Sequence, residues 1–387
     1  MIPYGRQDIN QADVDAVIAV LRSDFLTQGP AVPAFERAVS TRVGAAHALA
    51  MSSATAALHV ACLALDLGSG DLLWTSPNTF VASSNAALHC GADVDFVDID
   101  PLTWNMSVTA LEEKLQEARR VGRLPKIVVP VHFSGQATAQ QRIHALSQEF
   151  GFRIVEDASH AIGASRDGEP VGSCKWSDIT VFSFHPVKIV TTGEGGMALT
   201  NDERLATSMA LLRTHGITRD TSRFVGGGGG AWYYEQQRLG FNYRMTDIQA
   251  ALGVSQMTRL DHFVTRRNAL AARYDALLSA LPVQRPRVDA GNVSAWHLYV
   301  IRTLPAQSAT SHRAVFDGMR DRGIGVNLHY MPVHLQPYYR ELGFTPGQFP
   351  EAERYGEEAI SLPMFPGLTE VEQDTVVRAL GELLGCD

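Results

Sequence analysis

The chain has 387 residues, of which 45% are hydrophobic and 19% charged, and its formal net charge is −8. That composition excludes a disordered chain and a fibre, and the acidic balance argues against a general nucleic-acid-binding protein, which needs a basic face. Only four of the 33 basic side chains are lysines, so chemistry that needs a lysine amine has four candidates.

Cysteine usage and the first residues of the chain both favour the cytoplasm. The four cysteines are scattered without a CxxC pair, which is typical of neither a disulfide framework nor a zinc site. Residues 1–6 lack the apolar segment of a signal peptide. The most apolar stretch, residues 45–67, is interrupted by polar side chains and is too polar to span a membrane, which takes ~20 apolar residues. We therefore expect a cytoplasmic protein without a membrane segment.

The first two-thirds of the chain alternate between helical and strand-like patterns. Apolar residues at Val14, Val17, Ile18 and Leu21 have helical spacing, so residues 10–23 are predicted to form an amphipathic helix. Short apolar strands are predicted at residues 48–51, 72–75, 94–97, 127–131, 153–155, 179–183 and 197–199. Helices are predicted between the first five of them, at residues 54–65, 80–88, 108–119 and 138–150. This α/β alternation predicts a mostly parallel seven-stranded sheet with helices on both faces, where ligands bind at the carboxyl ends of strands.

The pattern changes after Asp202. Two helical stretches flank a loop with five glycines at 226–230, and the second helix is expected from about 246 toward 281. The glycine run lacks the GK[ST] of a phosphate loop, so we expect an exposed loop. A smaller α+β pattern follows, with strands at 296–301 and 326–330 and helices at 313–322 and near 370–384. We expect a large domain at 13–250 and a small C-terminal domain at 251–387 that includes residues 1–12.

The four lysines have different surroundings. Lys114 lies in an acidic helix, Lys126 begins a strand and Lys175 lies in a polar turn, so we expect these three at the surface. Lys188 instead follows the apolar strand 179–183 and precedes a turn rich in glycine and threonine. Desolvation at such a place lowers the pKa of a lysine and leaves a nucleophilic amine. A lysine that extends its amine into solvent is the alternative.

Two further features fit with Lys188. Asp157 ends a buried strand, where a carboxylate either caps a helix or pairs with a protonated pyridine nitrogen. The helix that starts at Ala54 and Thr55 begins with small residues, which either leave N–H groups open to an anion or reflect ordinary capping by Ser53. An enzyme that uses pyridoxal 5'-phosphate (PLP) needs a Schiff-base lysine, an acid for the ring nitrogen and a phosphate site. Their joint occurrence favours a PLP enzyme.

Other kinds of site are not supported. The histidines form neither HxxxH nor HExxH, so no metal site is predicted. The chain also lacks the GxSxG motif of a serine hydrolase with a nucleophile elbow.

The motifs around these residues resemble those of the DegT/DnrJ/EryC1/StrS sugar aminotransferases. They are LTQGP (26–30), SSATAAL (52–58), EDASH (156–160), SFHPVK (183–188), TGEGG (192–196) and GFNYRMT (240–246). Three more stretches are most similar to the pseudaminic acid branch of the family: IPYGRQ (2–7), WYYEQQ (232–237) and HYMPVHLQPYY (329–339). The resemblance implies the type I aminotransferase fold, a homodimer with a shared active site, and glutamate as amino donor. It also implies a UDP-linked 4-keto-6-deoxy-N-acetylhexosamine as substrate, aminated at C4 to UDP-4-amino-4,6-dideoxy-N-acetyl-β-L-altrosamine.

The resemblance assigns PLP-binding roles to individual residues. Lys188 would bind PLP as a Schiff base and move the proton, and Asp157 would keep the pyridine nitrogen protonated. Phe80 would stack on the ring, and His160 would lie near the ring or its hydroxyl group. The remaining assignments concern the phosphate and the nucleotide sugar: Ala54, Thr55 and Ser183 for the phosphate, Asn242 for the phosphate from the partner subunit, and Tyr4, Leu26, Thr27, His329 and Tyr330 for the sugar nucleotide.

Positions where relatives differ from one another, or where this chain differs from the family, decide which alternative functions remain open. Relatives that act as dehydratases carry histidine at the lysine position, so Lys188 favours transamination. The five-glycine run adjoins a segment expected near the substrate, which leaves the local sugar contacts open. Two alternatives remain: an aminotransferase for another UDP- or dTDP-4-keto-6-deoxy sugar, and a non-catalytic sensor that binds PLP or a nucleotide sugar.

Overall fold

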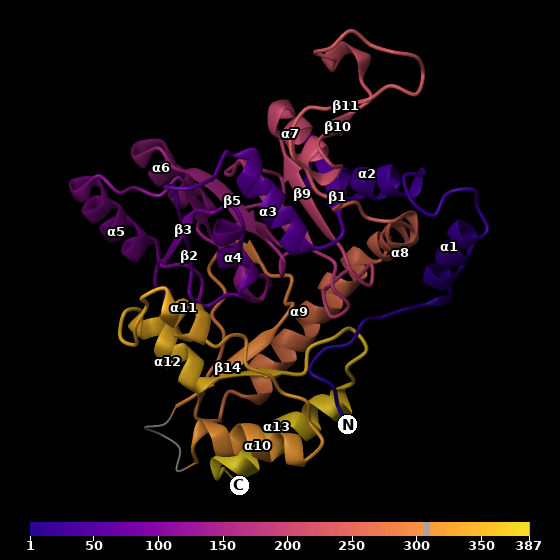
Figure 1. Ribbon diagram of the computed structural model, residues 1–387. Helices are drawn as coiled ribbons and strands as arrows, with labels where there is room; N and C mark the ends of the chain where they lie inside the picture. The colour runs from indigo at the N-terminus through magenta and orange to yellow at the C-terminus, as the bar shows by residue number, and fades with distance from the viewer. Residues whose placement is uncertain (305–309, 387) are drawn as a thin grey trace.

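A seven-stranded sheet forms the centre of the computed structural model, which describes residues 1–304 and 310–386 (Figure 1). From one edge to the other its strands are β1 (His47–Met51), β9 (Gly196–Thr200), β8 (Ile179–Ser183), β5 (Arg153–Asp157), β4 (Ile127–Val129), β2 (Leu72–Thr75) and β3 (Asp93–Phe96). Neighbours from β8 to β3 pair in parallel, whereas β9 is antiparallel to both β8 and β1. The predicted mostly parallel sheet is therefore confirmed, with each strand found within two residues of its expected ends.

Helices cover both faces of this sheet, as predicted. One face packs against α3 (Ala54–Ala64), α4 (Ala82–His89) and α7 (Glu203–Arg213). The other packs against α2 (Ala31–Val43), α5 (Val108–Val121) and α6 (Gln140–Phe150). The side chains of a strand point alternately to the two sides. On β8, Val181 accordingly joins the core under α3 and α4, and Phe182 joins the core under α2.

The first helix, α1 (Gln11–Leu21), forms where it was predicted but buries a different side. Its buried residue is Asp13, whose carboxylate accepts hydrogen bonds from Ser255 (2.6 Å) and Gln256 (2.7 Å) of α8 (Asp247–Met257). The apolar side of α1, including Leu21 at 55% exposure, faces solvent in this single chain.

The expected long helix from 246 toward 281 is two helices. They are α8 and α9 (Leu260–Leu277), separated at Thr258 and Arg259. The first turns of α9 join the core beside the large sheet, and its later turns join the C-terminal core. In Figure 1, α9 accordingly runs between the two parts of the molecule.

The C-terminal part has its own three-stranded sheet. Its strands are β12 (Val283–Gln284), β14 (Tyr299–Thr303) and β15 (Ala359–Leu362), and its helices are α10 (His312–Asp321), α11 (Pro337–Glu341), α12 (Pro350–Glu358) and α13 (Glu370–Leu384). The strand expected at 326–330 is wrong, because Asn327 alone makes an isolated bridge, to Ser361 of β15. The N-terminus joins this part through a bridge between Ile2 and Ile324. A boundary at residue 250 stays a prediction.

The remaining strands are short and lie outside the two main sheets. One set is β6 (Ser165–Arg166), β7 (Glu169–Pro170) and β13 (Asn292–Val293), and the other is β10 (Ile217–Thr218) with β11 (Glu235–Gln236). The loop between β10 and β11 holds the five glycines, is exposed as predicted, and extends away from the rest of the chain in Figure 1. Within the described residues, no helix is long and apolar enough to cross a membrane.

Candidate active site

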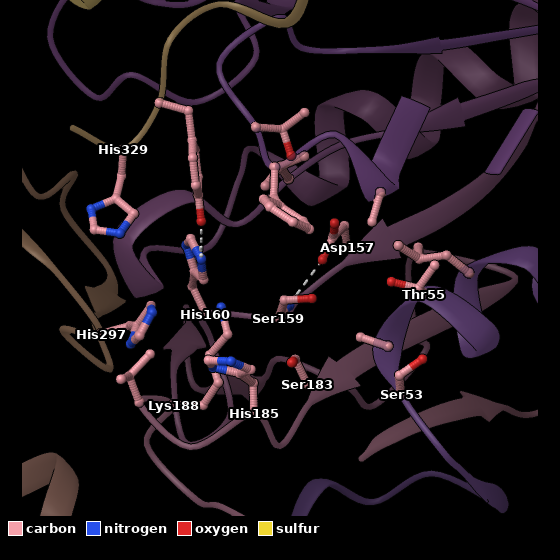
Figure 2. Close-up of a pocket in the computed structure, with 18 of the residues that line it drawn as sticks. Ser53, Thr55, Asp157, Ser159, His160, Ser183, His185, Lys188, His297 and His329 are labelled. Atoms are coloured by element: carbon pink, nitrogen blue, oxygen red, sulfur yellow. Dashed lines mark hydrogen bonds between the residues drawn. The ribbon is translucent and has the colours of Figure 1, made fainter. Parts of the chain in front are cut away.

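A cavity of about 640 Å³ opens beside the carboxyl ends of β5 and β8 (Figure 2). It lies where ligands bind in sheets of this kind. Ten of the thirteen predicted site residues line it: Tyr4, Ala54, Thr55, Phe80, Asp157, His160, Ser183, Lys188, His329 and Tyr330. Residues that are up to 326 positions apart in the sequence (Tyr4 and Tyr330) thus share one cavity.

Three predicted residues do not line the cavity of their own chain. Asn242 forms a bridge with Thr214, and Thr27 forms one with Thr246. The carbonyl of Leu26 accepts a hydrogen bond from the backbone of Asp247 (3.0 Å). The expectation that Asn242 reaches the site of a partner subunit stays a prediction.

Asp157 is held at the edge of the cavity by two donors. The Ser83 hydroxyl donates to its Oδ2 (2.6 Å), and the backbone N–H of Ser159 donates to its Oδ1 (3.1 Å). The side chain is 5% exposed, so its orientation is fixed by these contacts. Ser83, at the start of α4, was missed because nothing in a sequence shows which serine of a helix turns toward a distant strand.

Lys188 follows β8 through a tight turn in which its N–H donates to the His185 carbonyl (2.9 Å). The side chain is partly buried and lines the cavity, and no acceptor among residues 1–304 and 310–386 forms a hydrogen bond with its Nζ. Burial lowers the pKa of the amine to about 8, although the Asp157 carboxylate acts in the opposite direction. A part of the amine is therefore uncharged and nucleophilic near neutral pH.

The start of α3 supplies an anion site on the same cavity. Ser53 caps the helix by accepting from the N–H of Ala56 (3.1 Å), which leaves the N–H groups of Ala54 and Thr55 without a partner among the described residues. Gly196 of β9 lets this turn approach the sheet, because a Cβ there would lie 2.4 Å from the Ala54 nitrogen. Free N–H groups and the helix dipole suit a phosphate.

Three histidines form the opposite side. His160 Nε2 lies 3.1 Å from the Tyr330 hydroxyl, and the rings of His160 and His297 are 4.5 Å apart. His329 Nδ1 lies 2.8 Å from the Ser361 hydroxyl. Burial first, and then the nearby Lys188 charge, lower the pKa of all three histidines, that of His329 to about 3. They are therefore neutral at pH 7.

His297 is a cavity residue that the sequence did not reveal. It comes just before β14, in an apolar stretch where a histidine alone gives no sign of function. Its Nδ1 is buried without a partner in the described part of the chain. Figure 2 shows it beside His160 and Lys188.

The other lysines are outside the cavity. Lys126 and Lys175 pair at the surface with Asp71 and Glu169, both at 2.8 Å, as expected. The surface position expected for Lys114 is wrong. It is only 26% exposed, with its Nζ 2.7 Å from Asp95 and 5.0 Å from the Trp74 ring centre.

The cavity has the parts that PLP requires. Lys188 offers an amine for the aldehyde, Asp157 a carboxylate for the ring nitrogen, and the start of α3 an anion site. Phe80 lines the same cavity and is 59% exposed, so a face of its ring is open to an aromatic ligand. The fold and this set of groups define a PLP-dependent aminotransferase.

Comparisons with known proteins give the family. The model of the DegT/DnrJ/EryC1/StrS aminotransferase family matches residues 7–381. The spore coat polysaccharide biosynthesis protein SpsC of Bacillus subtilis is 36% identical over 387 residues, which covers 99% of this chain and 97% of SpsC. The chain belongs to this family and is a PLP-dependent nucleotide-sugar aminotransferase.

Solved structures agree over the whole chain. The PMP form of the sugar aminotransferase Spr1654 from Streptococcus pneumoniae superposes with a TM-score of 0.90 at 28% identity, covering 100% of this chain and 99% of that one. PseC of Helicobacter pylori, an aminotransferase in pseudaminic acid biosynthesis, superposes with a TM-score of 0.89 at 28% identity, covering 99% of each chain.

Proposed function

We propose that this protein transfers the amino group of glutamate to C4 of UDP-2-acetamido-2,6-dideoxy-β-L-arabino-hex-4-ulose. The product is UDP-4-amino-4,6-dideoxy-N-acetyl-β-L-altrosamine. The observation that carries the proposal is the Lys188 amine, with a pKa of about 8, in one cavity with Asp157 and the anion site of α3. The likeness to PseC and the pseudaminic-type stretches support this particular sugar.

Each group at the cavity takes a separate task in this proposal. PLP, when bound, supplies an electron sink that stabilises negative charge at the carbon that loses a proton. Lys188 removes that proton and returns it. Asp157, fixed by Ser83 and Ser159, holds a proton on the pyridine nitrogen, and Ala54, Thr55 and Ser183 bind the phosphate.

The groups around the open side of the cavity position the two substrates. Tyr4, His329 and Tyr330 line the side of the cavity that is formed by the C-terminal part of the molecule. Because the His329 imidazole is neutral, we propose that these side chains bind hydroxyl and amide groups of the sugar through neutral hydrogen bonds. Leu26, Thr27 and Asn242 lie outside the cavity of their own chain, which fits a role across a homodimer, with Asn242 binding the partner's phosphate. We also propose that the enzyme works in the cytoplasm.

One experiment tests both the reaction and the sugar. The purified protein is mixed with glutamate and, separately, with a panel of UDP- and dTDP-linked 4-keto-6-deoxy sugars, and products are identified by mass spectrometry and NMR. We expect 2-oxoglutarate and the 4-amino altrosamine product from the arabino-hexulose. Turnover of a different 4-keto sugar with none of this one would overturn the sugar assignment and favour an aminotransferase for that other UDP- or dTDP-4-keto-6-deoxy sugar.

A further inference from the structure

His297 lines the active-site cavity but has no task in the proposed function. Its side chain is 4% exposed, and its ring centre lies 4.5 Å from that of His160. Its Nδ1 is buried without a partner in the described part of the chain, and its Nε2 has no partner there either but is not closed off. Buried polar groups are normally hydrogen-bonded, so this imidazole is free to bind a ligand in the cavity.

The backbone that carries His297 is held at the cavity by strain and by a close approach. Trp296 has a φ of 47°, a left-handed conformation that costs free energy in a bulky residue. Gly135 lets the segment come near, because a Cβ there would lie 2.8 Å from the Trp296 nitrogen and 2.9 Å from the His160 carbonyl oxygen. Such strain persists only where the surrounding structure enforces it, and it clusters at ligand sites.

A buried positive charge lies directly behind His297. Arg267 of α9 is 1% exposed, and its Nη1 donates to three backbone carbonyls, those of Trp296 (3.0 Å), His297 (3.3 Å) and Met364 (3.1 Å). Burial lowers the pKa of the guanidinium to about 10, so it stays charged at pH 7. No carboxylate among the described residues forms an ion pair with it. Because a buried charge without a counter-ion is costly, an anion bound beside His297 would be stabilised.

The anion that fits this position is the α-carboxylate of the amino donor. Lys188 is the only lysine or arginine among the described residues that line the cavity, and Figure 2 shows His297 next to it. In the proposed reaction Lys188 removes a proton from the donor carbon, and the α-carboxylate is bonded to that same carbon. The side-chain carboxylate of glutamate is separated from this carbon by two CH2 groups, and the diphosphate of a sugar nucleotide is separated from C4 by the sugar ring.

We propose that His297 binds the α-carboxylate of glutamate through an N–H at Nε2, with the Arg267 charge behind it, and thereby orients the carbon that Lys188 deprotonates. This inference rests on the proposed function, in which glutamate is the amino donor. A hydrogen bond to a carboxylate is charge-assisted and stronger than one between neutral groups. Because the carboxylate and the departing hydrogen share one carbon, fixing the first restricts the direction of the second.

The test compares two non-reacting ligands on the full-length chain freed of PLP. One is N-(5'-phosphopyridoxyl)-L-glutamate, and the other is the matching compound of 4-aminobutyrate, which is glutamate without its α-carboxylate. Isothermal titration calorimetry should show that the wild type binds the first about tenfold more tightly. His297→Phe, which keeps a ring but lacks the N–H, should lose this preference, and His297→Gln, which restores an N–H donor, should keep most of it. An equal preference in His297→Phe and the wild type overturns the proposal.

Controls separate the carboxylate contact from damage to the cavity. His297→Phe should bind pyridoxamine phosphate as the wild type does, and a loss of that affinity as large as the loss for the glutamate compound overturns the proposal. Arg267→Met should also weaken the preference for the α-carboxylate. Arg266→Met, at the preceding residue of α9, should not, although Arg266 also donates to carbonyls, those of Pro366 (3.2 Å) and Leu368 (2.6 Å). If Arg267→Met does not fold, the His297→Phe comparison decides.

The holoenzyme distinguishes a failure of this inference from a failure of the proposed function. Glutamate should change the cofactor absorbance of the wild type, and His297→Phe should need about tenfold more glutamate for half the maximal rate. A wild type that glutamate leaves unchanged overturns the proposed amino donor and this inference together. A wild type that reacts, with a His297→Phe variant that needs no more glutamate, overturns this inference alone.

Discussion

The two walls of the active-site cavity differ in charge. The wall built from the large sheet carries the Lys188 amine and the Asp157 carboxylate. The wall built from the C-terminal part carries His297, His329 and Tyr330, which are uncharged at pH 7 because burial lowers the pKa of the imidazoles and raises that of the phenol. The reacting charges therefore stand on the ends of strands, and the opposite wall supplies neutral hydrogen-bonding groups.

This difference in charge predicts that substitutions on the two walls lower activity by different amounts. Groups on the sheet wall act on the proton transfer itself, where a missing group costs orders of magnitude. Groups on the C-terminal wall contribute single neutral hydrogen bonds, each with a net value of about 1 kcal/mol. Substitutions on the two walls should therefore separate clearly in activity.

The largest effect is expected for Lys188→Ala. Removing the amine removes the proton carrier, so kcat should fall by at least ~10³-fold. Steady-state kinetics with glutamate measures this. Lys175→Ala removes surface contacts alone, an ion pair with Glu169 (2.8 Å) and a position over the Trp176 ring (5.3 Å), and is the matched control with unchanged kcat. Activity retained in Lys188→Ala would remove the lysine from the mechanism.

Asp157→Asn should lower kcat by roughly 10²-fold. The amide has the shape of the carboxylate but cannot balance a positive charge on the pyridine nitrogen. Its signature is a loss of protonated cofactor in the absorbance spectrum together with the loss of rate. Ser83→Ala, which removes the 2.6 Å hydrogen bond to Oδ2 together with the contact of the Ser83 hydroxyl with Thr79 (2.8 Å), should show a smaller loss in the same direction. A near-normal rate in Asp157→Asn would contradict the pairing.

Most residues of the sheet wall of the cavity could be predicted from the sequence, whereas fewer residues of the C-terminal wall could. An apolar run in the sequence predicts a buried strand, and residues at or soon after its end lie at the carboxyl edge of the sheet. This reasoning placed Asp157 and Lys188 at that edge. Residues Tyr4, His329 and Tyr330 were placed through family motifs alone, since no local pattern carries a residue across the fold. His297 and Ser83 were missed because their positions depend on how separate elements pack. The burial of Lys114 against Trp74 escaped for the same reason.

The pKa of Lys188 gives a third prediction, an increase of about tenfold in the rate of PLP uptake between pH 7 and pH 9. With a pKa of about 8, the uncharged fraction of the amine rises from about one-tenth at pH 7 to about nine-tenths at pH 9. The rate at which protein freed of PLP takes the cofactor up should rise with it and level off near pH 9. Stopped-flow absorbance measures this rate. A rate that keeps rising to pH 11 would indicate an ordinary, solvated lysine.

On the C-terminal wall, Tyr330→Phe should lower kcat by only about fivefold. The change removes the hydroxyl that lies 3.1 Å from His160 Nε2, a single neutral hydrogen bond worth about 1 kcal/mol. His160, the partner of that hydroxyl, follows β5 on the sheet side of the cavity. His160→Gln should be similarly mild, because the amide can replace the imidazole as a partner. Kinetics of both half-reactions measures the effect. A loss as large as that of Asp157→Asn would show that this wall takes part in the proton transfer.

The smallest effect on activity is expected next to Asp157, at Glu156. The two carboxylates are neighbours on β5, but Glu156 points to the other side of the sheet. There it accepts hydrogen bonds from Gln140 (2.6 Å) and Thr180 (2.8 Å) and lies 3.5 Å from His132. Burial alone would raise its pKa, yet the charge of His132 and these hydrogen bonds outweigh burial and lower it. Glu156→Gln should therefore keep kcat within about twofold and act on stability instead.

The direction of the stability change follows from that lowered pKa. A carboxyl group with a lower pKa in the folded state stabilises it above the unfolded value, about pH 4.3, and loses the effect as the pH falls through the folded value. Urea unfolding at pH 7 should show Glu156→Gln less stable by about 3 kcal/mol, and the gap to the wild type should narrow below pH 4. Glu149→Gln, at an exposed ion pair with Arg119 (3.0 Å), should cost under about 1 kcal/mol. A gap that is constant with pH would mean that Glu156 stabilises the fold through packing rather than through its charge.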